Sequence, residues 1–322
     1  MRAVITPHRV PLVATTLVGV LLYAAAALAF HGFGTWGVFV DFLRDNAVLG
    51  LAAIGMTFVI LSGWIDLSVG AMVGFSSVLI AQLTMRAGWH PGCSIAVALL
   101  LGTAFGAGLG TLIHVFRLPP FLVTLGGMFL ARGAGFVISL ESITIRHPCY
   151  QVVDDFSFNV MPLTAVIFVA ALLAAIYVAH WTPFGRAVYA IGGSEPSAVL
   201  MGLPVGRTKV AVYAVSGLCS AGAGAVCTFY TASGNASAGT MLELDAIAAV
   251  VMGGTLLSGG VGHMFGTLLG VLIYCVIQTA LAFQGTLSSW WTRIAIGALL
   301  LAFILLQRLV QRRVVGKVGV ES

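Results

Sequence analysis

The chain has 322 residues, of which 60% are hydrophobic and only 8% are charged, and its mean hydropathy is +1.07. This composition excludes a soluble domain of this length and predicts an integral membrane protein. The net charge of +5 comes mostly from arginines near the chain ends and in a central loop, so no nucleic acid partner is expected. The five cysteines form no CxxC pair, and neither a disulfide framework nor a metal site is expected.

The apolar stretches predict about ten transmembrane helices, because about 20 apolar residues cross a bilayer. The first stretch is too long for a secretory signal peptide and lacks a small-residue cleavage site. Glycines within the apolar runs indicate close helix packing and broken or half helices. The fold class is therefore an all-α polytopic membrane protein, with these expected spans: Val10–Phe30, Asn46–Gly63, Leu67–Met85, Cys93–Phe116, Phe121–Leu140, Met161–Trp181, Val210–Tyr230, two within Ala246–Thr292, and Ile294–Leu306.

The distribution of charges predicts the orientation, because Lys and Arg concentrate in cytoplasmic loops. About ten spans place both termini in the cytoplasm. Arg86 and Arg132 do not fit this arrangement. The cytoplasmic side then holds Arg2, Arg9, Arg117, Arg186, Arg207, Lys209, Arg308, Arg312, Arg313 and Lys317. The outer side holds Asp41, Asp45, Glu141, Asp154, Asp155, Glu243 and Asp245.

The central loop Thr182–Lys209 is the polar, basic interruption between the two hydrophobic halves. Ser194 is a good N-cap, Pro196 suits a first turn, and Gly202 suits a helix end. The pattern predicts a helix of roughly two turns, which is too short to be stable alone in water. Two interpretations remain open: a capped loop at the membrane surface, or a coupling helix that presses into a separate motor subunit.

Other glycine-rich stretches interrupt the spans. Thr231–Leu242 is expected to be a polar turn or a re-entrant segment. Leu257–Gly260 reads LSGG, the signature of ATP-binding-cassette ATPases, but it lies in an apolar run and the chain has no phosphate-binding loop. We interpret these glycines as a tight helix break and expect no catalytic residues. Leu61–Gly74 and Leu257–Gly270 share a Leu-Ser-Gly start and two further glycines, which indicates either an internal repeat or chance.

Four long stretches resemble the permease subunits of bacterial ABC sugar importers, in the ribose/xylose/galactose branch. They are Asp45–Ala71, Leu118–Gly133, Phe184–Leu203 and Glu243–Gly270, and together they are specific for this family. Glu141–Tyr150 (ESITIRHPCY) and Gly285–Gly297 (GTLSSWWTRIAIG) are similar to permeases of galactofuranose importers. Trp64 departs from the family, which usually has Gly there in a GGIDLS motif.

The resemblance implies a single permease domain, residues 1–322, with a type II ABC importer-like fold and a cytoplasmic coupling loop at residues 182–209. It implies no cofactor, because ATP is bound by a partner subunit. The implied partners are a cytoplasmic ATP-binding subunit, a second permease (identical or different), a periplasmic sugar-binding protein and membrane lipid. The implied location is the bacterial inner (plasma) membrane, with several membrane passes.

The resemblance also assigns the coupling segment. Glu195 is expected to pair with a basic residue of the ATPase, and Ala198, Leu200 and Met201 to supply an apolar seat. Arg186, Arg207 and Lys209 are expected to anchor the loop at the anionic inner leaflet. The full predicted coupling set is Gly193, Ser194, Glu195, Pro196, Ala198, Leu200, Met201 and Gly202.

A neutral sugar requires polar partners along its path. Asp66 is of particular interest, because an ionisable residue within a span is costly and usually functional. Its alternative role is to cap the third span, and Glu243 and Asp245 equally suit a helix start at the outer surface. An ion-coupled secondary transporter of a small polar solute, with Asp66 as its carboxylate, is the alternative function. The candidate path residues are Asn46, Asp66, Ser68, Glu243, Asp245 and Gln278.

Overall fold

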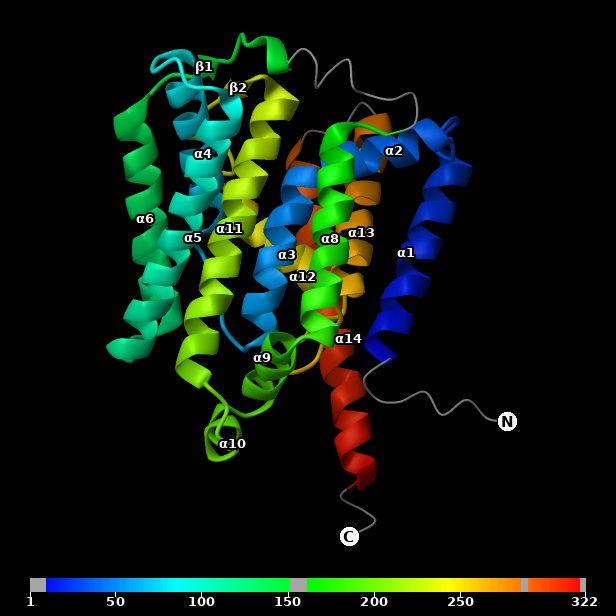
Figure 1. The fold of residues 1–322 in the computed structure, drawn as a ribbon. Helices are drawn as coiled ribbons and strands as arrows, with labels where there is room; N and C mark the ends of the chain where they lie inside the picture. The colour runs from blue at the N-terminus through cyan, green and yellow to red at the C-terminus, as the bar shows by residue number, and fades with distance from the viewer. Residues whose placement is uncertain (1–9, 151–160, 285–288, 319–322) are drawn as a thin grey trace.

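The protein is an all-α helical bundle, shown as a computed structural model in Figure 1, which describes residues 10–150, 161–284 and 289–318. Two very short strands, β1 (Ile143–Thr144) and β2 (Ser233–Gly234), accompany the helices. The helices are α1 (Val10–Ala29), α2 (Trp36–Asp45), α3 (Ala47–Leu61), α4 (Val69–Met85), α5 (Pro91–Val115), α6 (Pro120–Ile138), α8 (Leu163–Trp181), α9 (Pro183–Gly193), α10 (Glu195–Leu200), α11 (Val205–Thr231), α12 (Leu242–Met252), α13 (Met264–Gln284) and α14 (Ser289–Val318).

Several of these helices are apolar and long enough to cross a membrane, which confirms the polytopic all-α class. By length and composition, 5 helices qualify within the described residues: α5, α6, α8, α11 and α13. The pair α2 and α3 qualifies as one broken span with a bend of 57°. Shorter apolar stretches lie in α1, α4 and α14. The total of about ten spans remains a prediction.

Helix α3 is the centre of the bundle. Every residue of α3 except Val48 is buried, and its sequence AVLGLAAIGMTFVIL is apolar on all sides. A helix that is hydrophobic all round is stable only when other helices surround it. Figure 1 shows α3 among α8, α11, α12 and α13, with α5 and α6 further out on one side and α1 on the other.

The tightest helix pair in the bundle is α5 against α11. Gly102, Gly106 and Gly110 follow each other at four-residue spacing on α5, so they share one face. A Cβ atom added to Gly102 would lie 2.7 Å from the carbonyl oxygen of Gly217, and one added to Gly106 would overlap the carbonyl oxygen of Tyr213. The backbones of the two helices therefore approach as closely as small residues permit, as in membrane-embedded helix pairs.

The two ends of the bundle differ. Figure 1 shows α9 and α10 at one end, where α1 also begins and α14 ends. The opposite end carries α2 and the two strands. Arg117, Arg186 and Arg207 belong to the α10 end, and Asp41 and Asp45 belong to the opposite end. This separation of charge agrees with the predicted topology, whereas the side of the membrane that each end faces is still a prediction.

The strand pair at the α2 end of the bundle was not predicted from the sequence. Ile143 pairs with Gly234 and Thr144 with Ser233, in antiparallel register. Next to it, the Tyr150 hydroxyl lies 2.9 Å from that of Thr228 near the end of α11. These contacts fasten the loop after α6 onto the start of the segment that follows α11. The predicted outer residues Asp154 and Asp155 lie outside the described residues.

The seam between α5 and α11 yields a test of packing. We expect Gly106→Val to destabilise the folded protein by about 1–3 kcal/mol or more, because overfilling a packed interface forces the backbones apart. Gly108→Val is the matched control, since a Cβ at Gly108 meets nothing within 4 Å. The measurement is the thermal midpoint in one detergent, followed by size-exclusion chromatography. Equal midpoints for the two variants would show that the seam does not limit stability.

Candidate functional site

Helix α10 begins and ends as the sequence predicts. The Ser194 hydroxyl accepts a hydrogen bond from the Ser197 N–H at 3.3 Å, which makes Ser194 the N-cap. Pro196 lies in the first turn, and Gly202 has a φ of +74° just after the helix. A positive φ strains most residues with a side chain, so Gly202 suits the turn that leads into α11. The predicted short helix at the polar interruption is confirmed.

The outward face of α10 is apolar. Leu200 is 88% exposed, Met201 66% and Val199 57%. Ala198, which was predicted to belong to this apolar seat, is fully buried against Ile191 of α9 and Val205 of α11. The prediction for Ala198 is therefore wrong, because its methyl group attaches α10 to the bundle and is not available to a partner. The exposed seat consists of Val199, Leu200 and Met201.

The charges around α10 are arranged differently from the prediction. The Lys209 ammonium lies 3.2 Å from the Glu195 carboxylate, so Glu195 is paired within the chain. The Lys209 side chain is only 11% exposed. It is too buried to anchor the loop at a lipid leaflet, and that prediction is wrong for Lys209. Arg186 and Arg207 are exposed and remain available for anionic lipid.

Five glycines bring three separate parts of the chain together beside α10. Gly63 follows α3, Gly192 and Gly193 end α9, and Gly259 and Gly260 lie in the loop between α12 and α13. We call this set the glycine junction. Cβ atoms added to Gly259 and Gly260 would lie 2.7 Å from the Cα atoms of Gly63 and Gly193, respectively. Only glycine permits such close contact, which explains the LSGG sequence as a helix break and confirms that interpretation.

The glycine junction also joins the two stretches that resemble each other in sequence. The Gly260 N–H donates a hydrogen bond to the Leu61 carbonyl oxygen at 2.8 Å. On the other side, the Tyr189 hydroxyl of α9 donates to the Gly262 carbonyl at 3.0 Å. The end of α3, the end of α9 and the loop after α12 are therefore in direct contact.

The bend between α3 and α4, residues 62–68, returns into the bundle and is held there by Asp66. This carboxylate is 2% exposed. Its Oδ1 accepts from the Ser68 N–H at 2.9 Å and from the Ser68 hydroxyl at 2.6 Å, and its Oδ2 accepts from the Ser216 hydroxyl of α11 at 2.7 Å. Ser216 lies eleven residues from the start of α11, about 16 Å along that helix. Asp66 thus shapes the turn before α4 and also ties it to the middle of α11.

A second non-helical stretch, residues 233–241, enters the bundle from the opposite end. This stretch runs along α4, past Ser77, then Gly74, then Gly70. Asn235 is hydrogen-bonded to Ser77. A Cβ atom added to Gly74 would collide with the carbonyl oxygen of Ala238, and one added to Gly70 would collide with that of Gly239. The seven residues from Ser77 to Gly70 correspond to about 10 Å along α4, so the stretch enters the bundle by about that distance. Of the two interpretations of this stretch, the re-entrant segment is confirmed.

Arg132 of α6 holds the re-entrant segment in place. Its Nη1 donates to the carbonyl oxygens of Ala236 at 2.6 Å and Ala238 at 2.8 Å, and its Nη2 donates to that of Gly239 at 3.4 Å. Backbone carbonyls that lack helical partners are costly inside a membrane unless another group satisfies them. This role explains why Arg132 lies within a span and does not obey the charge rule for loops.

Glu243 lies deep in the bundle, and the predicted helix start at the outer surface is wrong for it. Its Oε2 lies against Gly70, fifteen residues or about 22 Å from the C-terminal end of α4. Glu243 is 9% exposed, and Oε2 has no hydrogen-bond partner among the described residues. The N-cap of α12 is Met241, which makes no side-chain capping hydrogen bond. Glu243 is therefore a buried acceptor at mid-depth.

The remaining predicted path residues do not lie in one site. Asp66 and Ser68 share the bend, and Glu243 and Asp245 share the first turn of α12. Gln278 is exposed on α13. Asn46 lies at the break between α2 and α3, where its amide donates to the Phe42 carbonyl at 3.3 Å.

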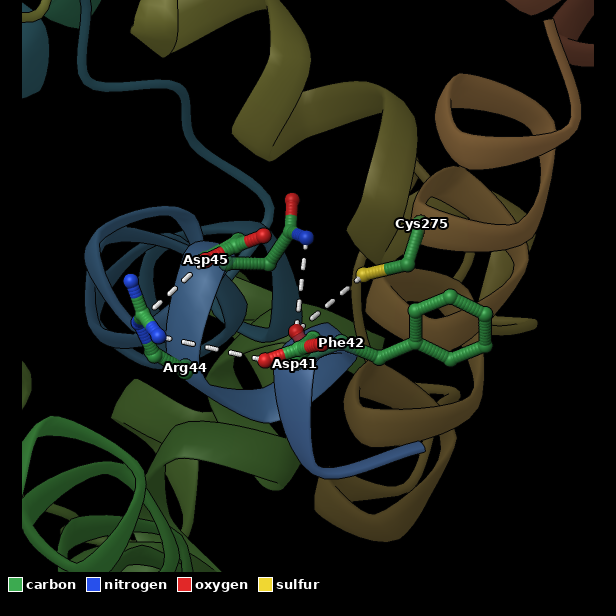
Figure 2. A network of polar contacts seen from close by, with 6 residues as sticks. Asp41, Phe42, Arg44, Asp45 and Cys275 are labelled. Atoms are coloured by element: carbon green, nitrogen blue, oxygen red, sulfur yellow. Dashed lines mark hydrogen bonds and ion pairs between the residues drawn. The ribbon is translucent and has the colours of Figure 1, made fainter. Parts of the chain in front are cut away.

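A small polar network surrounds the break between α2 and α3, and Figure 2 shows it from close by. Arg44 lies 3.9 Å from Asp41 and 3.7 Å from Asp45, and all three side chains are about half exposed. The Cys275 thiol of α13 donates to the Phe42 carbonyl at 3.7 Å, which attaches α2 to the bundle. Exposed ion pairs contribute little to stability. We therefore interpret this cluster as a feature of the exposed end of the broken span.

The end of the bundle that carries the strand pair also contains a cavity of about 290 Å³, which is open to the surface and lined largely by residues with polar side chains. Most of its lining side chains carry hydroxyl or amide groups, and none is charged. The cavity opens where the re-entrant segment begins. It is lined by Ser142, Cys227, Thr231, Ser233, Asn235, Ser237 and Ala238.

Sequence reasoning missed Ser216 and Arg132 as site residues, and it gave Lys209 a different role, as a lipid anchor. Only Arg132 gave a signal, because it contradicted the positive-inside pattern. Ser216 and Lys209 acquire their partners, Asp66 and Glu195, only through tertiary contacts. Among the described residues, no group of three His, Cys, Asp or Glu side chains is placed to hold a metal ion.

A bundle with broken helices at mid-depth and a short, exposed apolar helix at one end defines the membrane-embedded subunit of a transporter. The chain belongs to the family described as branched-chain amino acid transport system / permease component, which it matches over residues 38–304. Members of this family are ABC transporter permease components, so the chain is a non-enzymatic translocation subunit.

Similar proteins cover nearly the whole chain. The inner membrane ABC transporter permease protein YjfF of Escherichia coli is 46% identical over 306 residues, covering 94% of this chain and 92% of that protein. The fructose import permease protein FruG of Bifidobacterium longum is 37% identical, covering 94% and 91%. The ribose import permease protein RbsC of Bacillus subtilis is 40% identical, covering 83% and 84%. No solved structure matches the chain.

The hydrogen bonds of Asp66 at the bend predict how substitutions of this residue change the stability of the protein. In Asp66→Asn the remaining Oδ1 still accepts from Ser68, and the new amide donates to the Ser216 hydroxyl, so stability is expected to change by less than about 1 kcal/mol. Asp66→Leu leaves buried donors unsatisfied and is expected to cost at least about 2 kcal/mol. Thermal midpoints and substrate uptake, at matched membrane levels, measure both effects.

The pair Asp41→Asn and Asp41→Leu serves as the control for Asp66, since the Asp41 side chain is about half exposed and lies 3.9 Å from Arg44 in an exposed ion pair. An Asn variant at position 66 that is as inactive as the Leu variant would show that the negative charge itself is used. That outcome would revive the ion-coupled alternative.

Proposed function

We propose that the chain is the membrane-spanning subunit of an ATP-driven importer that moves a monosaccharide across the bacterial inner membrane. The observation that carries the proposal is the re-entrant segment, residues 233–241, with a polar cavity at its outer start. Hydroxyl and amide groups without charge suit a neutral, polyhydroxylated solute better than a zwitterionic amino acid. Relatives named as fructose and ribose import permeases support the same class of substrate.

The sugar path follows the re-entrant segment. Non-helical backbone at membrane depth is tolerated only where protein covers it or where it lines a water-filled cavity. Ser237 and Thr240 of this segment are exposed, and so is Leu244 in the first turn of α12. This face is therefore covered by a second permease, identical or different, and the path lies between the two. Arg132 and Glu243 line or support it.

Galactofuranose is the particular sugar we propose, with related pentoses or hexoses as the alternatives. The stretch at residues 141–150, which resembles permeases of galactofuranose importers, lies at the outer end of the path. Ser142 from this stretch lines the polar cavity.

The α10 end faces the cytoplasm in this proposal, together with both termini. ATP is bound by a separate cytoplasmic subunit, whose groove receives the exposed apolar seat of Val199, Leu200 and Met201. A periplasmic sugar-binding protein delivers substrate to the opposite end, beside α2 and the strand pair. Membrane lipid surrounds the exposed hydrophobic faces of helices such as α5 and α6.

The apolar seat predicts a weakened ATPase contact in Leu200→Ser. Because burying a leucine contributes about 1.5–3 kcal/mol, association with the ATP-binding subunit is expected to weaken by about 10- to 100-fold. The thermal midpoint of the isolated permease should not change, since Leu200 is exposed. Leu118→Ser, another exposed leucine at the same end, is the control. Unchanged association in Leu200→Ser would remove α10 as the docking element.

The transport proposal itself is tested in liposomes. The chain, its partner permease and the ATP-binding subunit are reconstituted together, and uptake of radiolabelled galactofuranose from the binding protein is measured with ribose, xylose and fructose as competitors. Uptake should require ATP, and galactofuranose should be preferred. The permease alone with a proton or sodium gradient should accumulate no sugar. Gradient-driven uptake without ATP would instead establish a secondary transporter.

A further inference from the structure

Trp64, the residue that departs from the GGIDLS pattern, lies in a defined contact between the bend and α10. Its ring is nearly parallel to that of Tyr213 on α11, with an angle of 17° and 6.2 Å between ring centroids. The Lys209 ammonium lies over the Trp64 ring, 4.4 Å from its centroid. The ring also packs against the apolar cluster of Ile191, Ala198 and Val205 that holds α10.

Lys209 is the charged centre of this arrangement. A nearly buried ammonium is stable only when other groups compensate its lost hydration. Here the compensation comes from two parts of the chain: the Glu195 carboxylate of α10 and the Trp64 ring of the bend. A cation–π contact strengthens when it is desolvated, so the ring is a substantial partner.

The bend continues from this contact to the middle of the bundle. The Tyr213 hydroxyl donates to the Ile65 carbonyl at 3.5 Å, and the next residue, Asp66, accepts from Ser216. A displacement of α10 therefore disturbs this arrangement, because Glu195 would either draw Lys209 away from Trp64 or lose its ion pair with Lys209. In contrast, a glycine at position 64 would leave Lys209 with Glu195 alone.

We propose that Trp64 and Lys209 are positioning residues that couple the movement of α10 to the bend, and that they are the route by which ATP hydrolysis in the partner subunit gates the sugar path. This inference rests on the proposed ATP-driven function. It assigns Trp64 to energy coupling and not to narrowing of the path, since its ring lies against the elements that hold α10.

The test measures coupling directly, as ATP molecules hydrolysed per sugar imported by the complete importer in liposomes. Trp64→Gly and Lys209→Met should raise this ratio about fivefold, the factor that corresponds to about 1 kcal/mol of lost cation–π contact. Trp64→Phe keeps an aromatic ring and Lys209→Arg keeps the charge, so both should stay close to the parent. The double variant Trp64→Gly/Lys209→Met should raise the ratio by less than the product of the two single effects, because the two changes remove one shared contact.

Different results overturn different conclusions. An unchanged ratio in Trp64→Gly and Lys209→Met would overturn the positioning role, and so would equal loss of coupling in the conservative variants. If Trp64→Gly fails to insert, the comparison of Lys209→Met with Lys209→Arg decides the question. A parent importer that takes up no sugar with ATP would instead refute the proposed function, before any variant is compared.

Discussion

The structure depends on one constraint, namely that backbone N–H and C=O groups inside a membrane need partners within the protein. Two non-helical stretches interrupt the bundle, and each satisfies this constraint in its own way. Arg132 donates to three carbonyls of the re-entrant segment, whereas Asp66 accepts from a backbone N–H and two hydroxyls at the bend. A charged side chain inside each interrupted region thus replaces the hydrogen bonds that a continuous helix would have made.

Glycine allows non-helical parts of the chain to come into direct contact. At the junction beside α10, backbone from three parts of the chain lies in contact, and α5 and α11 approach each other through a second row of glycines. A larger side chain at most of these positions would separate the elements, since packed interiors adapt little to added volume. The bend, the end of α9 and the loop after α12 can therefore transmit displacements to one another directly.

Three buried or partly buried charged side chains each have partners within the protein. Lys209 has Glu195 and Trp64, Arg132 has backbone carbonyls, and Asp66 has hydroxyl groups. Such pairing is what low-dielectric surroundings require of an ion. Asp66, the carboxylate considered for ion coupling, already uses both oxygens, whereas Glu243 keeps one oxygen without a hydrogen-bond partner among the described residues. Membership of the ABC permease family, in which energy arrives from outside the chain, rests on the family match.

The sequence alone was sufficient for the membrane class, the short capped helix at Ser194 and the family, because these rest on local composition, capping and long motifs. It also placed most spans within a few residues, since apolar length is a local property. It did not reveal that Glu243 lies at mid-depth, that Ala198 faces inward, or that Lys209 is buried between Glu195 and Trp64. Those facts depend on side chains that are distant in sequence and adjacent only after packing. Tertiary structure decided them, because burial and pairing are properties of neighbours and not of the residue itself.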